Sequence, residues 1–180
     1  AVIFGSQKST DLTRPVFKEK DQGSILIPTG GTSSDTLRFA IHRWESLEAQ
    51  SLMVQTFLGD KAINSICCLP LFHVSGLMQV IRAIASNGQI LFSQLNELES
   101  ASKLVAVEDF CLSLVPTQLS RLISKGFIFE KMDKFKAIFL GGAPTSDSLL
   151  KKAKDYSLPI VMSYGMTETA GMICAQSKES

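Results

Sequence analysis

The run SYGMTET at residues 163–169 places an aromatic ring, a glycine, a hydroxyl and a carboxylate in one segment, which we predict to be a loop. The Glu168 carboxylate can hold Mg²⁺ against phosphate oxygens, and the adjacent Thr167 hydroxyl can bond a phosphoryl group. A structural alternative is that Thr167 and Glu168 only begin a helix, because hydroxyls and acids favour helix N-termini. This run is the most specific chemical signal in the sequence.

A second polar run, PTGGTSS at residues 28–34, directly follows a predicted strand. Its glycines let the backbone turn tightly and expose N–H groups, and its hydroxyls add donors, so that it could cradle phosphates. An ordinary polar turn has the same composition. The run lacks the second glycine and the Gly-Lys-Ser/Thr ending of a Walker A loop, which disfavours a P-loop kinase.

Two further runs follow predicted strands. In LPLFHVSG at residues 69–76, the lone His73 stands between a strand and a helix, where it would face a ligand, cap backbone groups or pack in the core. In LGGAP at residues 140–144, the missing side chains would let a planar ring approach the main chain, although a plain strand-to-helix turn would look the same. Position, rather than residue type, makes both runs candidate ligand loops.

In this order and spacing, the four runs resemble the core motifs of the acyl-adenylate-forming superfamily of acyl-CoA synthetases, luciferases and peptide-synthetase adenylation domains. The resemblance extends from about residue 23 to residue 175. Within the superfamily, ILIPTGGTS, RFAIH and LPLFHVSGL are most similar to 2-succinylbenzoate–CoA ligases of menaquinone and phylloquinone synthesis. The resemblance implies that an acid attacks the α-phosphorus of ATP to give acyl-AMP, which CoA then converts to a thioester. The implied cofactor is Mg²⁺, with ATP and CoA as co-substrates.

The resemblance also assigns roles to individual residues. The residues implied to bind the ATP phosphates are Thr29, Gly30, Gly31, Thr32, Ser33, Ser34 and Arg38. Those implied to bind adenine are Gly141, Gly142, Ala143, Tyr164 and Gly165. The acid pocket would contain His73, Ser75, Gly76 and Thr117. The implied catalytic residues are His73, Thr167 and Glu168, with Glu168 as the Mg²⁺ ligand.

The phosphate run departs from the superfamily pattern. Ser34 stands at a usual glycine and Leu37 at a usual lysine, so that Arg38 would supply the charge with a different geometry. Two alternatives follow: an adenylating ligase for another aryl or fatty acid, and a degenerate nucleotide-binding module. An acyltransferase with His73 as base is disfavoured, because no HxxxD motif is present.

Strand and helix patterns alternate along the chain and predict the scaffold for these runs. We predict strands at residues 25–27, 63–69, 89–92, 110–115, 136–140 and 159–162, and helices at 43–57, 76–86, 117–124 and 146–156. Ser146 is the expected cap of the last helix. Residues 93–106 and 127–134 fit more than one state. The expected fold is α/β, a mostly parallel sheet with flanking helices, part of the large N-terminal domain of an acyl-adenylate-forming enzyme. The loops after residues 27, 69, 115, 140 and 162 should share one rim of this sheet.

Composition narrows the classes of partner and cellular location that fit this chain. The 180 residues are 45% hydrophobic, and 18 basic against 17 acidic residues give a net charge of +1, which does not favour nucleic acid or an anionic membrane as partner. No apolar run is long enough to span a bilayer, and the four cysteines form no CxxC pair, so we expect a soluble cytoplasmic protein with reduced thiols. We expect residues 1–22 to be a polar lead-in and residues 23–180 a partial AMP-binding domain without its small C-terminal domain. A homodimer stays open.

Overall fold

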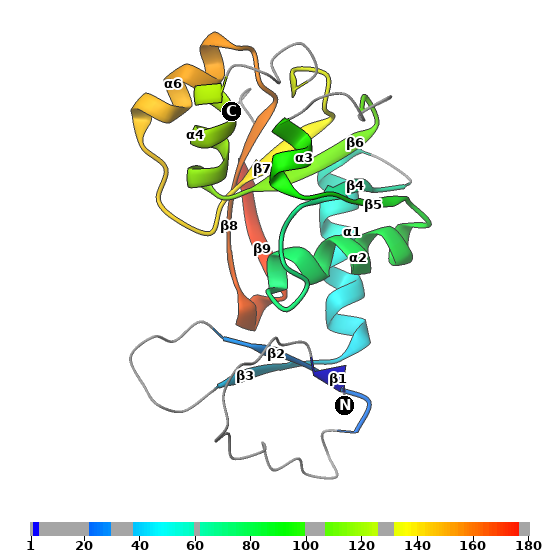
Figure 1. Ribbon diagram of the computed structural model, residues 1–180. Helices are drawn as coiled ribbons and strands as arrows, with labels where there is room; N and C mark the ends of the chain where they lie inside the picture. Colours follow the sequence, from blue (N-terminus) through cyan, green and yellow to red (C-terminus); the bar gives the residue numbers. More distant parts are fainter. Residues whose placement is uncertain are drawn as a thin grey trace.

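The chain forms two β-sheets, seen in a computed structural model that describes residues 2–3, 22–29, 38–59, 62–99, 107–125 and 132–176. The larger sheet comprises β4 (Asn64–Cys67), β5 (Ile90–Phe92), β6 (Phe110–Leu114), β7 (Ala137–Leu140), β8 (Ile160–Met166) and β9 (Gly171–Gln176). The smaller comprises β1 (Val2–Ile3), β2 (Ile25–Pro28) and β3 (Phe39–His42). Figure 1 shows the smaller sheet below the larger one, next to the end of β8 and β9.

The larger sheet is mostly parallel. Its strands follow the order β5-β4-β6-β7-β8-β9, and only the β8–β9 pair is antiparallel. Parallel neighbours need crossover connections, and three helices lie in these connections: α2 (Val74–Ser86), α4 (Pro116–Lys125) and α6 (Asp147–Asp155). The predicted α/β architecture with flanking helices is therefore confirmed.

Helices cover both faces of this sheet. Figure 1 shows α4 and α6 on one side, and α2 with α1 (Trp44–Leu58) on the other. The strands alternate accordingly, since successive side chains of a strand point to opposite faces. Leu112 and Ile138 pack in the cluster under α4 and α6, whereas Cys111 and Phe139 pack with Val54 of α1. Burial on both faces explains why these strands appear in the sequence as short continuous apolar runs.

The predicted helices agree with the structure to within two residues at each end. The Ser146 hydroxyl accepts a hydrogen bond from the Leu149 backbone N–H at 3.3 Å, which confirms the expected cap of α6. Within the ambiguous segment 93–106, a short helix α3 (Leu95–Glu99) forms, and residues 100–106 lie outside the described residues. Most of the other ambiguous segment, 127–134, also lies outside them.

Three sequence expectations are corrected. Strand β2 does not join the larger sheet, as the expected shared rim required, because it pairs antiparallel with β3 in the smaller sheet; residues 30–37 after it lie outside the described residues. Residues 163–166 are not a loop but continue β8, where they pair with β9 around a bulge at Tyr164 and Gly165. Strands β3 and β9 were not predicted, and Val2–Ile3 of the expected lead-in pairs with β2. In each case the strand forms by pairing with another strand and could not be recognised from the residue pattern of its own segment.

The start of α2 supplies a test of this packing. A Cβ atom on Gly76 would overlap the carbonyl oxygen of Pro70. In an unobstructed helix, Gly→Ala stabilises by about 1 kcal/mol. Here we expect Gly76→Ala to lower the free energy of unfolding by about 1–3 kcal/mol, because the backbone must move. Urea unfolding measures the change, Ser75→Ala at the neighbouring exposed position is the control, and a gain in stability for Gly76→Ala would contradict the close approach.

Candidate functional site

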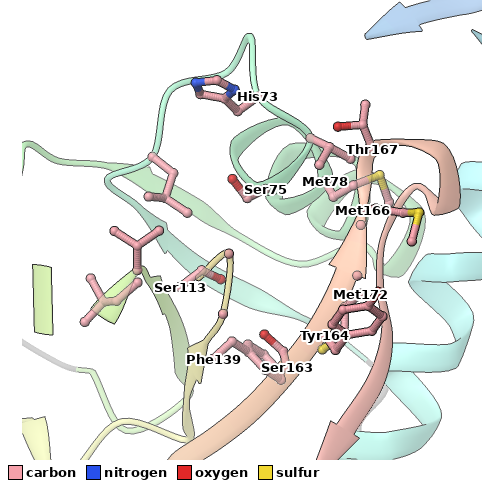
Figure 2. A pocket seen from close by; sticks show the side chains of 18 of the residues that line it. His73, Ser75, Met78, Ser113, Phe139, Ser163, Tyr164, Met166, Thr167 and Met172 are labelled. Carbon is pink, nitrogen blue, oxygen red and sulfur yellow. The ribbon is translucent and has the colours of Figure 1, made fainter. Parts of the chain in front are cut away.

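A cavity of about 550 Å³ opens at the carboxyl edge of the parallel strands. Its wall comes from the segments that follow β4, β6 and β7, from the distal half of β8, and from the bend between β8 and β9. A crevice outside the carboxyl ends of parallel strands is the usual ligand position in open α/β sheets. Figure 2 shows side chains from these separate segments around one space.

The cavity gathers some of the predicted site residues and leaves others away from its wall. The predicted residues that line it are His73, Ser75, Gly141, Gly142, Tyr164, Gly165 and Thr167. The described residues that were predicted but do not line it are Thr29, Arg38, Gly76, Thr117, Ala143 and Glu168. The phosphate-run residues Gly30, Gly31, Thr32, Ser33 and Ser34 lie outside the described residues.

The bend after β8 presents Thr167 and Glu168. Residues Thr167–Thr169 form a single 3-10 turn, and Ala170 closes it in the left-handed conformation with φ 57°. The Thr169 hydroxyl accepts from the Met166 N–H at 3.1 Å and lies 2.8 Å from the Gly171 carbonyl oxygen. This anchoring leaves the half-buried Thr167 on the cavity wall and the Glu168 carboxylate in solvent beside it. The structural alternative is therefore observed, because these residues begin a helical turn, and Thr167 also lines the cavity. The Mg²⁺ and phosphate contacts of this run stay predictions.

The LGGAP turn and the end of β8 both contribute to the cavity wall. Gly141 has no room for a Cβ atom against Ser163, whose hydroxyl donates to the Leu140 carbonyl at 3.2 Å. Gly142 adopts a positive φ of 80° and is exposed. Tyr164 exposes 61% of its surface on the neighbouring strand. Backbone without side chains on one side and an aromatic ring on the other suit a planar heteroaromatic group.

His73 belongs to the cavity rather than to the core. It is the N-cap residue of α2, but its side chain makes no capping hydrogen bond and is exposed. Its ring lies 4.5 Å from the Phe72 ring, centroid to centroid, and Figure 2 shows it at one end of the pocket. The His73 side chain therefore neither caps the helix nor packs in the core, which were two of the three roles that the sequence left open.

Sequence reasoning missed several cavity residues, and Arg82 of α2 is the charged one among them. Its side chain is buried, with 6% exposed, and lines the cavity. Its Nε donates to the Gln50 side-chain oxygen at 3.2 Å, and Gln50 in turn donates to the Met172 carbonyl at 2.9 Å. Burial lowers the pKa of Arg82 to about 10, so it remains a cation at neutral pH. An arginine within the apolar run LMQVIRAIA was the available signal, because buried charges normally have a partner.

The cysteines are not candidate nucleophiles of this cavity. All four are free; Cys67 and Cys111 are buried, Cys68 is half-buried and Cys174 is exposed. Burial raises the pKa of Cys67, and burial beside Cys67 raises the pKa of Cys68 to about 12. Within the described ranges, no cluster of three or more His, Cys, Asp or Glu side chains could hold a metal ion. The described residues also contain no helix long and apolar enough to cross a membrane.

The edge cavity, with its glycine-rich turn, exposed aromatic ring and adjacent hydroxyl–carboxylate bend, is a candidate nucleotide site on an α/β sheet. The chain belongs to the AMP-binding enzyme family, which matches residues 7–180. It is 30% identical over 174 residues to the 2-succinylbenzoate–CoA ligase of Enterococcus faecalis. That match covers 94% of this chain and 36% of the relative, so the chain spans little more than a third of the relative's length.

Solved structures share the fold. O-succinylbenzoate coenzyme A synthetase (MenE) from Bacillus subtilis in complex with AMP has a TM-score of 0.74 and 24% identity over 86% of this chain and 32% of that one. The same enzyme in complex with ATP and magnesium ion has a TM-score of 0.71 and 25% identity, with the same shares of both chains covered. These likenesses agree with the mostly parallel α/β architecture described above.

The thiols allow a direct check of the packing around the cavity. Because the raised pKa keeps Cys68 protonated, only on the order of one molecule in ten thousand carries its thiolate at pH 8. We expect a disulfide reagent at pH 8 to modify Cys174 rapidly and Cys68 slowly in the folded chain. Cys174→Ser should remove the fast phase, and denaturant should make every thiol fast. A fast phase assigned to Cys68 in the folded Cys174→Ser variant would contradict the described burial.

Proposed function

We propose that the chain is the nucleotide- and acid-binding part of an ATP-dependent acid–CoA ligase that activates 2-succinylbenzoate. The reaction would give acyl-AMP and pyrophosphate, and CoA would then displace AMP, in menaquinone or phylloquinone biosynthesis in the cytoplasm. The observation that carries the proposal is a single cavity whose wall combines residues of three of the four runs with a buried arginine. Because the chain spans 36% of its relative's length, the whole reaction is proposed for the complete reading frame that contains it.

The nucleotide would lie along the β7–β8 side of the cavity. Tyr164 and the exposed backbone of Gly141 and Gly142 would enclose adenine, and the Thr167 hydroxyl would bond the α-phosphate. Thr29 stands at the base of the phosphate run, where its N–H donates to the Arg38 carbonyl at 2.9 Å and closes the β2–β3 hairpin. The phosphate-binding residues of this run would extend from that base.

Glu168 is the residue that would hold Mg²⁺. Its carboxylate is exposed on the bend next to Thr167, free to share an ion with phosphate oxygens. A single carboxylate suits Mg²⁺, which commonly binds through one or two carboxylates plus substrate phosphates. When bound with ATP, the ion would neutralise part of the phosphate charge.

The acid half of the cavity favours a substrate with two carboxylates. One carboxylate of 2-succinylbenzoate must reach the α-phosphorus, and the other has to be placed elsewhere. Arg82 offers a buried guanidinium on the cavity wall, while the apolar side chains of Met78, Val74 and Met172 line the same space. Benzoate or a simple fatty acid would leave that cation without an anion, which costs free energy in a buried site.

The chemistry requires no nucleophile on the enzyme. Two groups of like charge, a carboxylate and a triphosphate, must be aligned while charge builds up at phosphorus. Positioning and electrostatic stabilisation provide most of the rate acceleration in such transfers. Backbone N–H groups, the Thr167 hydroxyl and His73 at the entrance to α2 are groups of this type. CoA would enter only after acyl-AMP has formed.

The first test isolates the adenylation half-reaction. In the complete reading frame that contains this chain, we expect ATP–pyrophosphate exchange that depends on 2-succinylbenzoate, with benzoate and fatty acids as weak substrates. Glu168→Gln should lower exchange by at least a hundredfold, because it removes the charge that holds Mg²⁺ without changing side-chain size. Exchange with another acid instead would remove the substrate assignment, and ATP binding without exchange for any acid would favour a degenerate binding module.

A second test addresses the acid. We expect Arg82→Leu to raise the KM for 2-succinylbenzoate about 10- to 100-fold, the size of a lost charge-assisted hydrogen bond. The KM of Arg82→Lys for 2-succinylbenzoate should lie between those of wild type and Arg82→Leu, since lysine keeps the charge but not the planar fork. Exchange supported by benzoate should be nearly unchanged, and this acid is the internal control. Equal losses for both acids would show that Arg82 stabilises the fold rather than recognising the second carboxylate.

A further inference from the structure

The buried His42 joins the two sheets at the candidate site. It is the last residue of β3 in the smaller sheet, and only 6% of its surface is exposed. Its Nε2 lies 2.7 Å from the backbone carbonyl oxygen of Thr167, 125 residues away. Because a carbonyl oxygen can only accept, Nε2 must carry the hydrogen and donate it. The donor ring therefore fixes the peptide plane between Thr167 and Glu168, which is rigid.

A second contact holds the other end of the same bend. The Gln50 side chain, which lies on α1, donates to the Met172 carbonyl at 2.9 Å. Met172 lies near the start of β9, so the stretch 42–50 holds the 167–172 bend at both ends. Apolar packing supports this brace, since Ala170 of the bend shares a buried cluster with Ile27 of β2 and Leu47 of α1. Figure 2 shows Thr167, Met166 and Met172 together on that side of the pocket.

We propose that His42 is a positioning residue for adenylation, which sets the Thr167–Glu168 peptide at the cavity edge relative to the β2–β3 hairpin. This inference rests on the proposed function for the roles of Thr167 and Glu168, but not for the hydrogen bond itself. Strand β2 pairs with β3 from Ile25↔His42 to Pro28↔Phe39. His42 thus links the smaller sheet, by a hydrogen bond, to the turn that bears Thr167 and Glu168.

Such a link affects ATP more than the acid. Thr167 and Glu168 are both proposed to act at the ATP phosphates, and misplacement by about 1 Å can cost on the order of a hundredfold in rate. The acid-facing Arg82 is held through Gln50 and α2, and the His42–Thr167 hydrogen bond takes no part in that contact. Loss of the His42 donor should therefore change parameters for ATP while leaving those for the acid nearly constant. A residue that only stabilised the fold would not separate the two.

The test compares three substitutions in the complete reading frame. Gln can place its amide nitrogen where the His Nε2 lies, Asn is too short to reach, and Leu fills the space without a donor. We expect His42→Leu and His42→Asn to lower kcat/KM for ATP in pyrophosphate exchange at least tenfold, with the KM for the acid changed less than twofold. His42→Gln should stay within threefold of wild type. Equal losses for Gln, Asn and Leu, or none, would overturn the proposal.

A second measurement does not depend on catalysis. Amide hydrogen–deuterium exchange of peptides spanning residues 163–172 should be at least fivefold faster in His42→Asn than in wild type, and close to wild type in His42→Gln. Indistinguishable exchange in all three proteins would overturn the positioning role. If wild type shows no pyrophosphate exchange with any acid but these rates differ as expected, the proposed function fails and the link remains. If His42→Leu is insoluble, the Asn and Gln pair decides.

Discussion

Burial of both faces of the central strands is the constraint on which the other features of the structure depend. Leu112, Ile138 and Leu140 point into one layer, and Cys111, Ala137 and Phe139 point into the other. A sheet covered on both sides leaves its strand ends as the places where polar groups can reach solvent and ligands. The four chemical runs follow this rule in different ways: two of them follow parallel strands, one continues a strand, and one belongs to a separate hairpin.

The buried Arg82 shows how stability and recognition oppose one another in this cavity. Removing a guanidinium from water is unfavourable, and a neutral amide such as Gln50 compensates only part of that cost. A well-packed apolar residue would generally serve the fold as well or better. A cation retained on a cavity wall is more readily explained by an anion that binds there.

Much of the architecture could be predicted from the sequence, because local signals suffice for buried strands and capped helices. The apolar runs of β4, β6 and β7 and the Ser146 cap are examples. The parts that could not be predicted depend on partners distant in sequence. Gly171–Gln176 was not predicted as a strand and becomes β9 by pairing with β8, and β2 was expected in the larger sheet until its pairing with β3 placed it in the smaller one. Arg82 and His42 have no motif, since each is defined by a contact with Gln50 or Thr167 rather than by its neighbours in the chain.

The long sequence separation of the contacts around the bend has a consequence for how the chain folds. The His42–Thr167 contact closes a loop of 125 residues, and the Gln50–Met172 contact closes one of 122. By chain statistics, such closure costs on the order of 2 kcal/mol more than closing a ten-residue loop. Helices and neighbouring parallel strands can form before that cost is met, whereas the bend cannot be held until both ends of the chain have docked. The ligand cavity should therefore be the last region to become ordered during folding and the first to be lost under mild denaturation, so that nucleotide binding would report completion of the fold.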